Sequence, residues 1–192
     1  MTIADCYDAL ARMIEYPDNK QGLQSDCDTV SSFMNEQCKD RHSILPFADF
    51  MSASSLAQLQ EEYVATFDFN PATAPYLGHH LFGDNQKKAV YMVMLKQEFE
   101  RRGYTPTGVE LPDHLSVLLA FLGHRARRDG KEDGEMDQDG LSSRRKFIAD
   151  CVLPGVERMN AAFATKHDSN WKALVETAWL LCAADCKEVP SC

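Results

Sequence analysis

Three segments of the sequence place acidic, aromatic and histidine side chains close together along the chain. Residues 61–68 read EEYVATFD, residues 75–84 read PYLGHHLFGD, and residues 110–115 read ELPDHL. Carboxylates and imidazoles can ligate a metal, transfer a proton or pair with a cationic group. The sequence contains no GxGxxG, P-loop, GxSxG or HExxH motif, so an enzyme is less expected than a binding protein.

The histidines and cysteines leave one alternative open, a metal-binding helical protein or an enzyme. His79 and His80 are adjacent, so on a helix their side chains point about 100° apart and do not suit one metal ion. A metal would need His114 or a cysteine brought in by the fold. The seven cysteines are odd in number, scattered and without a CxxC motif, so we expect reduced thiols. Cys182 and Cys186 are four residues apart and could share one helix face.

The ELPDHL segment lies where a loop is expected to meet an apolar helix. We expect that helix over residues 111–128, with Pro112 in its first turn, where no amide donor is needed. Asp113 then lies near the positive end of the helix dipole, and His114 suits a neutral hydrogen-bonding role there. Two interpretations stay open: capping that stiffens the joint, or side chains that grip a peptide.

The other two segments are predicted to supply core packing and the ends of helices. Tyr63 and Phe67 are four residues apart and share a helix face, with Asp68 at its end, which predicts a core-facing aromatic pair beside solvated acids. Residues 76–82 predict a short helix, and Asp84 is the expected cap of the helix that follows.

Apolar residues recur at helical spacing nearly everywhere, while alternating patterns are absent and β-branched residues are sparse. We therefore predict one all-α domain over residues 1–192, a bundle of about eight or nine helices. Residues 129–140, DGKEDGEMDQDG, are acidic, rich in glycine and poor in apolar residues, so we expect a mobile exposed loop there. Its spacing does not fit an EF-hand calcium loop.

Composition and charge narrow the class of partner. The chain of 192 residues is 44% hydrophobic, enough to bury a core without disulfides or a structural metal. Its net charge of −9 argues against nucleic acid and against a basic membrane-binding module. No apolar stretch approaches the roughly 20 residues of a membrane span, and the first residues lack a secretory pattern, so we expect a cytoplasmic protein without stable membrane insertion.

With these segments in view, the chain resembles the assembly chaperones of complex molybdenum oxidoreductases, and more closely their nitrate reductase delta-subunit branch. The resemblance is carried by EYPD (15–18), EEYVATFDFN (61–70), PYLGHHLFGD (75–84) and ELPDHLSVLLAFL (110–122). Order and spacing match from about residue 5 to about residue 165. The resemblance implies an all-helical domain with no catalytic residue and no cofactor of its own.

The resemblance also implies a partner. Family members bind the catalytic subunit of a molybdenum oxidoreductase by its N-terminal segment, a twin-arginine leader or its remnant. They keep that subunit competent for molybdenum cofactor insertion before membrane assembly or export. The acidic insertion and the cysteine-rich end depart from the family pattern, so the client stays open between nitrate reductase and a related enzyme.

In the wider family, a proline–aspartate–histidine joint is associated with leader binding, and a second shared segment is expected to line the same groove. The residues of this chain expected to bind the peptide are Glu110, Pro112, Asp113, His114, Tyr76, Leu77, Asp84, Tyr63, Phe67 and Asp68. Apolar groove walls could take the apolar stretch of a leader, and carboxylates such as Asp68 and Asp113 could pair with its arginines.

Overall fold

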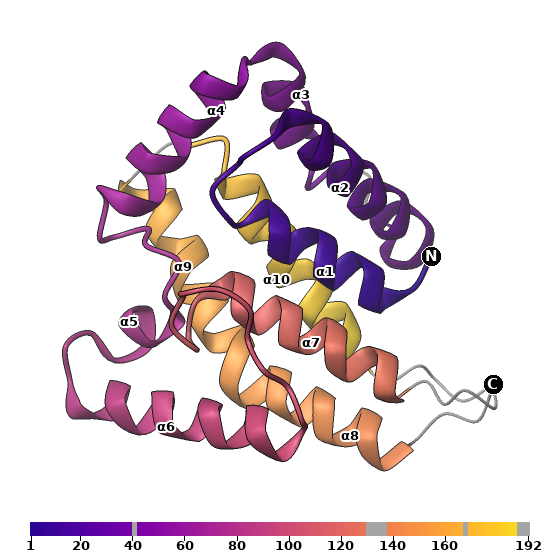
Figure 1. The fold of residues 1–192 in the computed structure, drawn as a ribbon, viewed down its shortest axis with the longest axis vertical. Helices are drawn as coiled ribbons and strands as arrows, with labels where there is room; N and C mark the ends of the chain where they lie inside the picture. Colours follow the sequence, from indigo (N-terminus) through magenta and orange to yellow (C-terminus); the bar gives the residue numbers. More distant parts are fainter. Residues whose placement is uncertain (40–41, 130–137, 167–168, 188–192) are drawn as a thin grey trace.

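The chain folds into helices joined by short connections (Figure 1). The computed structural model describes residues 1–39, 42–129, 138–166 and 169–187. In chain order its elements are α1 (Ile3–Met13), α2 (Lys20–Phe33), η1 (Met34–Cys38), α3 (Leu45–Ala53), α4 (Leu56–Tyr63), η2 (Val64–Asp68), α5 (Leu77–Phe82), α6 (Gln86–Arg101), α7 (Leu115–Asp129), α8 (Gln138–Phe147), η3 (Ile148–Val152), α9 (Leu153–Lys166) and α10 (Lys172–Cys186).

The three π-helical segments do not interrupt the helices that they follow. The segment η1 continues α2, η2 continues α4, and η3 joins α8 to α9, so the described ranges form nine continuous helical segments. In those ranges the one strand-like contact is an isolated bridge between Tyr76 and His114. The predicted all-α bundle of about eight or nine helices is therefore confirmed.

Side-chain caps begin several helices. Ser55 caps α4 through a reciprocal box with Gln58, and Thr2 does the same for α1 with Asp5. The cap predicted for α6 was one residue early. Asn85, rather than Asp84, accepts a hydrogen bond from the Lys87 amide at 3.0 Å.

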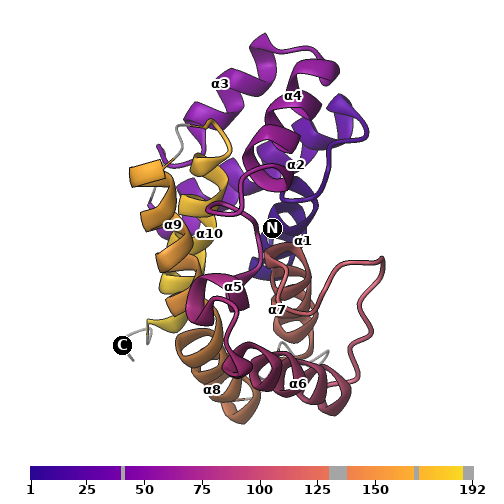
Figure 2. The ribbon, with the colours of Figure 1, turned by 90° about the vertical axis from the view of Figure 1, so that its left-hand side faces the viewer.

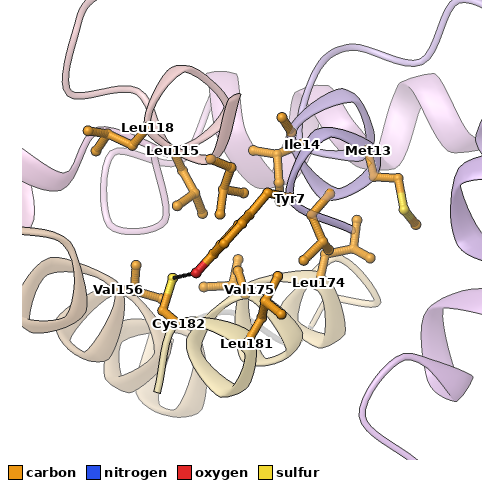
Figure 3. Close-up of a cluster of buried hydrophobic side chains, with 14 of the residues drawn as sticks. Tyr7, Met13, Ile14, Leu115, Leu118, Val156, Leu174, Val175, Leu181 and Cys182 are labelled. Carbon is orange, nitrogen blue, oxygen red and sulfur yellow. Dashed lines mark hydrogen bonds between the residues drawn. The ribbon is translucent and has the colours of Figure 1, made fainter. Parts of the chain in front are cut away.

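The core lies where α1 meets α7 and α10. Figure 3 shows the buried ring of Tyr7 from α1 directed toward α10, among apolar side chains of all three helices. The helices α1 and α7 approach closely because α7 carries a glycine at the crossing. A Cβ atom at Gly123 would lie 3.2 Å from the carbonyl oxygen of Ala4.

A buried ion-pair network ties α7, α8 and α10 together beside Tyr7. Arg144 contacts Asp129 at 2.5 Å and Asp185 at 2.8 Å, and the Tyr7 hydroxyl donates to Asp185 at 3.0 Å. All three charged side chains are almost completely buried. The ends of the predicted acidic loop were therefore wrong, because Asp129 closes α7 and residues 138–140 begin α8. Residues 130–137 lie outside the described ranges.

None of the helices in the described ranges combines the length and the apolar character that a bilayer crossing demands.

Replacement of Arg144 by alanine should lower the free energy of unfolding by about 3–5 kcal/mol, because it leaves two buried carboxylates without their cation. The matched control is Arg12→Ala, which removes an ion pair to Asp26 whose arginine side chain is 58% exposed. That control should cost less than about 1 kcal/mol. Urea unfolding followed by circular dichroism measures both, and equal losses would contradict a buried network.

Candidate functional site

Two of the three segments picked out in the sequence pair with each other. The amide of Leu77 donates to the Asp113 carbonyl at 2.9 Å, and the amide of Leu115 donates to the Pro75 carbonyl at 2.7 Å. These bonds flank the bridge between Tyr76 and His114. We call residues 75–78 and 112–115 together the joint. It fixes the start of α5, which packs against α6 and α9, to the start of α7 (Figure 2).

Asp113 caps α5 across the joint. Its Oδ2 atom accepts a hydrogen bond from the Gly78 amide at 3.1 Å, in the first turn of a helix of only six residues. The carboxylate comes so near that a Cβ atom at Gly78 would lie 2.6 Å from Oδ2, which explains the glycine there. Asp113 is fully buried, and burial raises the pKa of its carboxyl group, while the Gly78 hydrogen bond and then the charge of Lys88 act to lower it.

His114 is a buried, neutral part of the joint. Its Nδ1 atom lies 2.8 Å from the Ser116 hydroxyl and accepts a hydrogen bond from the Ser116 amide at 3.2 Å. Burial lowers the pKa of His114 to about 4, although the nearby Glu110 carboxylate acts to raise it. The neutral hydrogen-bonding role expected for His114 is therefore confirmed at neutral pH.

Glu110 and Tyr76 form the outer edge of the joint. The Tyr76 hydroxyl donates to Glu110 Oε2 at 2.7 Å, and its ring packs edge-on against His114 at 5.1 Å between centroids. The Glu110 side chain is 40% exposed. Glu15 follows the end of α1. Burial raises the pKa of its carboxyl group, a side-chain hydrogen bond to Ser116 acts to lower it, and the charge of Glu110 acts to raise it.

Tyr63 and Phe67 belong to the core, as the aromatic-pair interpretation predicted. They pack edge-on against each other and against Trp171 of the loop before α10, and both are buried. The Tyr63 hydroxyl donates to the Ile14 carbonyl at 3.2 Å, which fixes α4 to the end of α1. One aromatic neighbour differs: Tyr16 packs edge-on against Tyr63 but is 51% exposed.

Peptide binding by the ten expected residues stays a prediction, and the structure sorts them by exposure. Six have buried side chains: Leu77, Pro112, Asp113, His114, Tyr63 and Phe67. Three are exposed and one is half-buried: Glu110, Asp68, Asp84 and Tyr76. The helix predicted to begin at residue 111 begins at Leu115 instead, because the backbone before it pairs with residues 75–77. Asp84 follows the far end of α5, away from the Asp113 cap.

Exposed charged and apolar side chains occur in three segments, residues 15–18, 68–69 and 110–111, and one carboxylate of each segment acts on the buried Tyr63. We call the acidic face the set Glu15, Tyr16, Asp18, Asp68, Phe69, Glu110 and Leu111. Burial is the main cause that raises the pKa of the buried Tyr63, and the charges of Asp68, Glu110 and Glu15 add to that effect. Three of its members are large apolar residues that are exposed, with exposed fractions of 82% for Phe69, 51% for Tyr16 and 49% for Leu111.

A hollow of about 350 Å³ extends the acidic face between the end of α1 and the start of α2. Glu15, Tyr16 and Asp18 line it together with Arg12 and Asp26. Arg12 is paired with Asp26, so Glu15 and Asp18 supply the excess charge. In the sequence, EYPD carries part of the resemblance. Apolar residues are generally expected to be buried, so the sequence did not predict the exposure of Tyr16, Phe69 and Leu111.

The metal-site alternative gains no support in the described ranges, where no three histidine, cysteine, aspartate or glutamate side chains converge closely enough to hold an ion. His80 Nε2 lies 2.8 Å from the Ala74 carbonyl, and His114 is bonded to Ser116. Cys182 is buried beside the Tyr7 hydroxyl, while Cys186 is only partly buried and donates to the Arg145 carbonyl.

The described ranges thus form an all-helical domain in which a buried polar joint connects α5 to α7. The family model described as "Nitrate reductase delta subunit" matches residues 36–174, and the chain belongs to this family.

Curated relatives carry more specific names. The "Probable nitrate reductase molybdenum cofactor assembly chaperone NarJ" of Bacillus subtilis (strain 168) is 30% identical over 117 residues, which are 60% of this chain and 62% of that protein. The "Nitrate reductase molybdenum cofactor assembly chaperone NarJ" of Escherichia coli (strain K12) is 27% identical over 125 residues, or 64% of this chain and 53% of that protein. The chain thus spans between half and two thirds of the length of these relatives.

Replacement of Asp113 by alanine should lower the free energy of unfolding by about 1–2 kcal/mol, because the Gly78 amide loses its acceptor at the start of α5. Asp113→Asn should cost less, since an amide oxygen can still accept. Asp84→Ala is the matched control, an exposed aspartate at the other end of α5, and should change stability by under about 0.5 kcal/mol. Equal losses for both alanine variants in urea unfolding would contradict the capping role.

His114 should make the protein sensitive to mild acid. The unfolded state takes up its proton near pH 6.5 and the folded state only near pH 4, so stability falls as pH decreases through that window. The loss attributable to His114 is about 3 kcal/mol. Unfolding curves at several pH values should show that His114→Gln flattens this dependence and that His79→Gln does not. An unchanged slope in His114→Gln would contradict burial of a neutral imidazole.

Proposed function

We propose that this protein is a chaperone, not an enzyme, for the catalytic subunit of a molybdenum oxidoreductase such as respiratory nitrate reductase. It binds the N-terminal segment of that subunit and keeps it competent for molybdenum cofactor insertion before membrane assembly or export. Membership of the nitrate reductase delta subunit family supports this proposal, as do the names of the two relatives.

The observation that carries the proposal is the composition of the acidic face. Its exposed carboxylates suit the basic residues of a leader-type segment, because charge-assisted hydrogen bonds between arginine and carboxylate are among the strongest polar contacts. Its exposed Tyr16, Phe69 and Leu111 suit the apolar stretch of such a segment. Such a surface would bind a peptide by burying its apolar side chains and pairing with its basic residues, so it needs no catalytic group.

The joint holds Tyr76 and Glu110 of this surface in position. Asp113 and His114 are buried, so they position the edge instead of contacting the peptide. Asp113 fixes the backbone beside Tyr76, His114 packs against the Tyr76 ring, and Tyr76 holds the Glu110 carboxylate. The whole chain adds a net charge of −9, which favours encounter with a basic segment and predicts weaker binding at high salt.

Calorimetry with a peptide copied from the N-terminus of the cognate catalytic subunit tests the proposal. Glu110→Gln removes the charge but leaves an oxygen for the Tyr76 hydroxyl, so it should weaken binding about 3–10-fold without disturbing the fold. Glu15→Gln should act similarly, and the double variant should lose more. Glu36→Gln, an exposed glutamate on η1, is the matched control and should bind like the wild type.

A second arm replaces the basic residues of the peptide by glutamine, which should lower its affinity for the wild type and abolish the difference between wild type and Glu110→Gln. Absence of binding to the peptide and to the cofactor-free catalytic subunit would refute the proposed function. Binding that is unaffected in the Glu15 and Glu110 variants would refute the acidic face as its site.

A further inference from the structure

Arg158 of α9 holds the far end of α5, opposite the cap that the joint provides. Its Nη1 atom donates to the carbonyl oxygens of Leu81 at 2.7 Å and of His80 at 3.3 Å. The last four carbonyl groups of a helix lack partners within that helix, and α5 has only six residues. Since the Gly83 amide donates to the His79 carbonyl at 2.8 Å, Gly83 and Arg158 together satisfy three of these four groups.

The backbones of α5 and α9 also approach each other closely (Figure 2). A Cβ atom at Gly155, one turn before Arg158 in α9, would lie 2.8 Å from the Cβ atom of the fully buried Leu77. A cation at the C-terminal end of a helix is in addition favoured by the helix dipole. Arg158 therefore fixes one end of α5 to α9, while Asp113 fixes the other end to the start of α7.

The position of α5 determines where two parts of the acidic face lie. Tyr76 directly precedes α5, and its hydroxyl donates to the Glu110 carboxylate at 2.7 Å. His80, inside α5, donates from Nε2 to the Ala74 carbonyl at 2.8 Å, in the loop that follows Phe69. A shift of α5 would thus displace Glu110 through Tyr76, and the loop behind Phe69 through His80.

We propose that Arg158 is a positioning residue for peptide binding, which acts on the acidic face through α5 and does not contact the peptide. This inference rests on the proposed function. Arg158 is exposed, so its positive charge by itself would repel a basic peptide. Removal of that charge alone predicts tighter binding, whereas release of α5 predicts weaker binding. The sign of the change in affinity therefore distinguishes the two effects.

Calorimetry with the N-terminal peptide of the cognate catalytic subunit tests the proposal, at a temperature where circular dichroism shows each variant fully folded. Arg158→Ala should weaken binding about 3–5-fold. Arg158→Lys should recover part of this loss, because an ammonium group can still donate to the two carbonyl groups. Lys96→Ala removes an exposed cation from α6 and is the matched control, which should bind at least as tightly as the wild type.

Coupling to Glu110 separates positioning from a general loss of stability. Arg158→Ala should cost less affinity in the Glu110→Gln background than in the wild type, because the carboxylate that it positions is already absent. Hydrogen–deuterium exchange of Arg158→Ala should be faster at the Gly83 amide and unchanged in α1.

Unchanged or tighter binding in Arg158→Ala would overturn this inference and leave the proposed function standing. An equal loss of affinity in the Glu110→Gln background would overturn it as well. Failure of the wild type to bind the peptide would instead count against the proposed function itself, and this inference would fall with it.

Discussion

One contact organises the proposed binding surface: the carboxylate of Asp113 at the first turn of α5. It accepts the Gly78 amide across the joint and leaves no room for a side chain at residue 78. A six-residue helix is too short to be stable alone, so its cap must come from elsewhere in the fold. This contact fixes Tyr76 beside His114 and, through the Tyr76 hydroxyl, directs Glu110 toward the surface.

The bundle separates two kinds of electrostatic surface. The carboxylates of the acidic face lie around Tyr63 and Tyr76, with exposed apolar side chains among them. Four arginines, Arg101, Arg102, Arg125 and Arg128, gather where α6 and α7 end. The apolar core lies where α1 meets α7 and α10.

Local sequence patterns predicted structural features that depend on residues close together in the chain. They missed contacts between residues that are far apart in the chain. The buried pair Tyr63 and Phe67 follows from their spacing of four residues on one helix face. The partner of Asp113 is 35 residues away, so capping at this joint could be expected from the sequence, whereas the helix that Asp113 caps, α5, could not. The acidic composition of residues 129–140 predicted exposure, whereas Asp129 is buried because Arg144 pairs with it. The exposure of Phe69 could not be predicted, because apolar residues are generally expected inside the fold.

The central claim is that a rigid buried joint presents the acidic face, and that the peptide binds to that face without opening the joint. Hydrogen–deuterium exchange of the protein, alone and with the N-terminal peptide of its catalytic-subunit partner, tests this most directly. The account predicts slower exchange at residues 15–18, 68–69 and 109–111 on binding, with the amides of Leu77 and Gly78 slow in both states. Faster exchange at Leu77 and Gly78 in the complex, with no protection of the three segments, would contradict it.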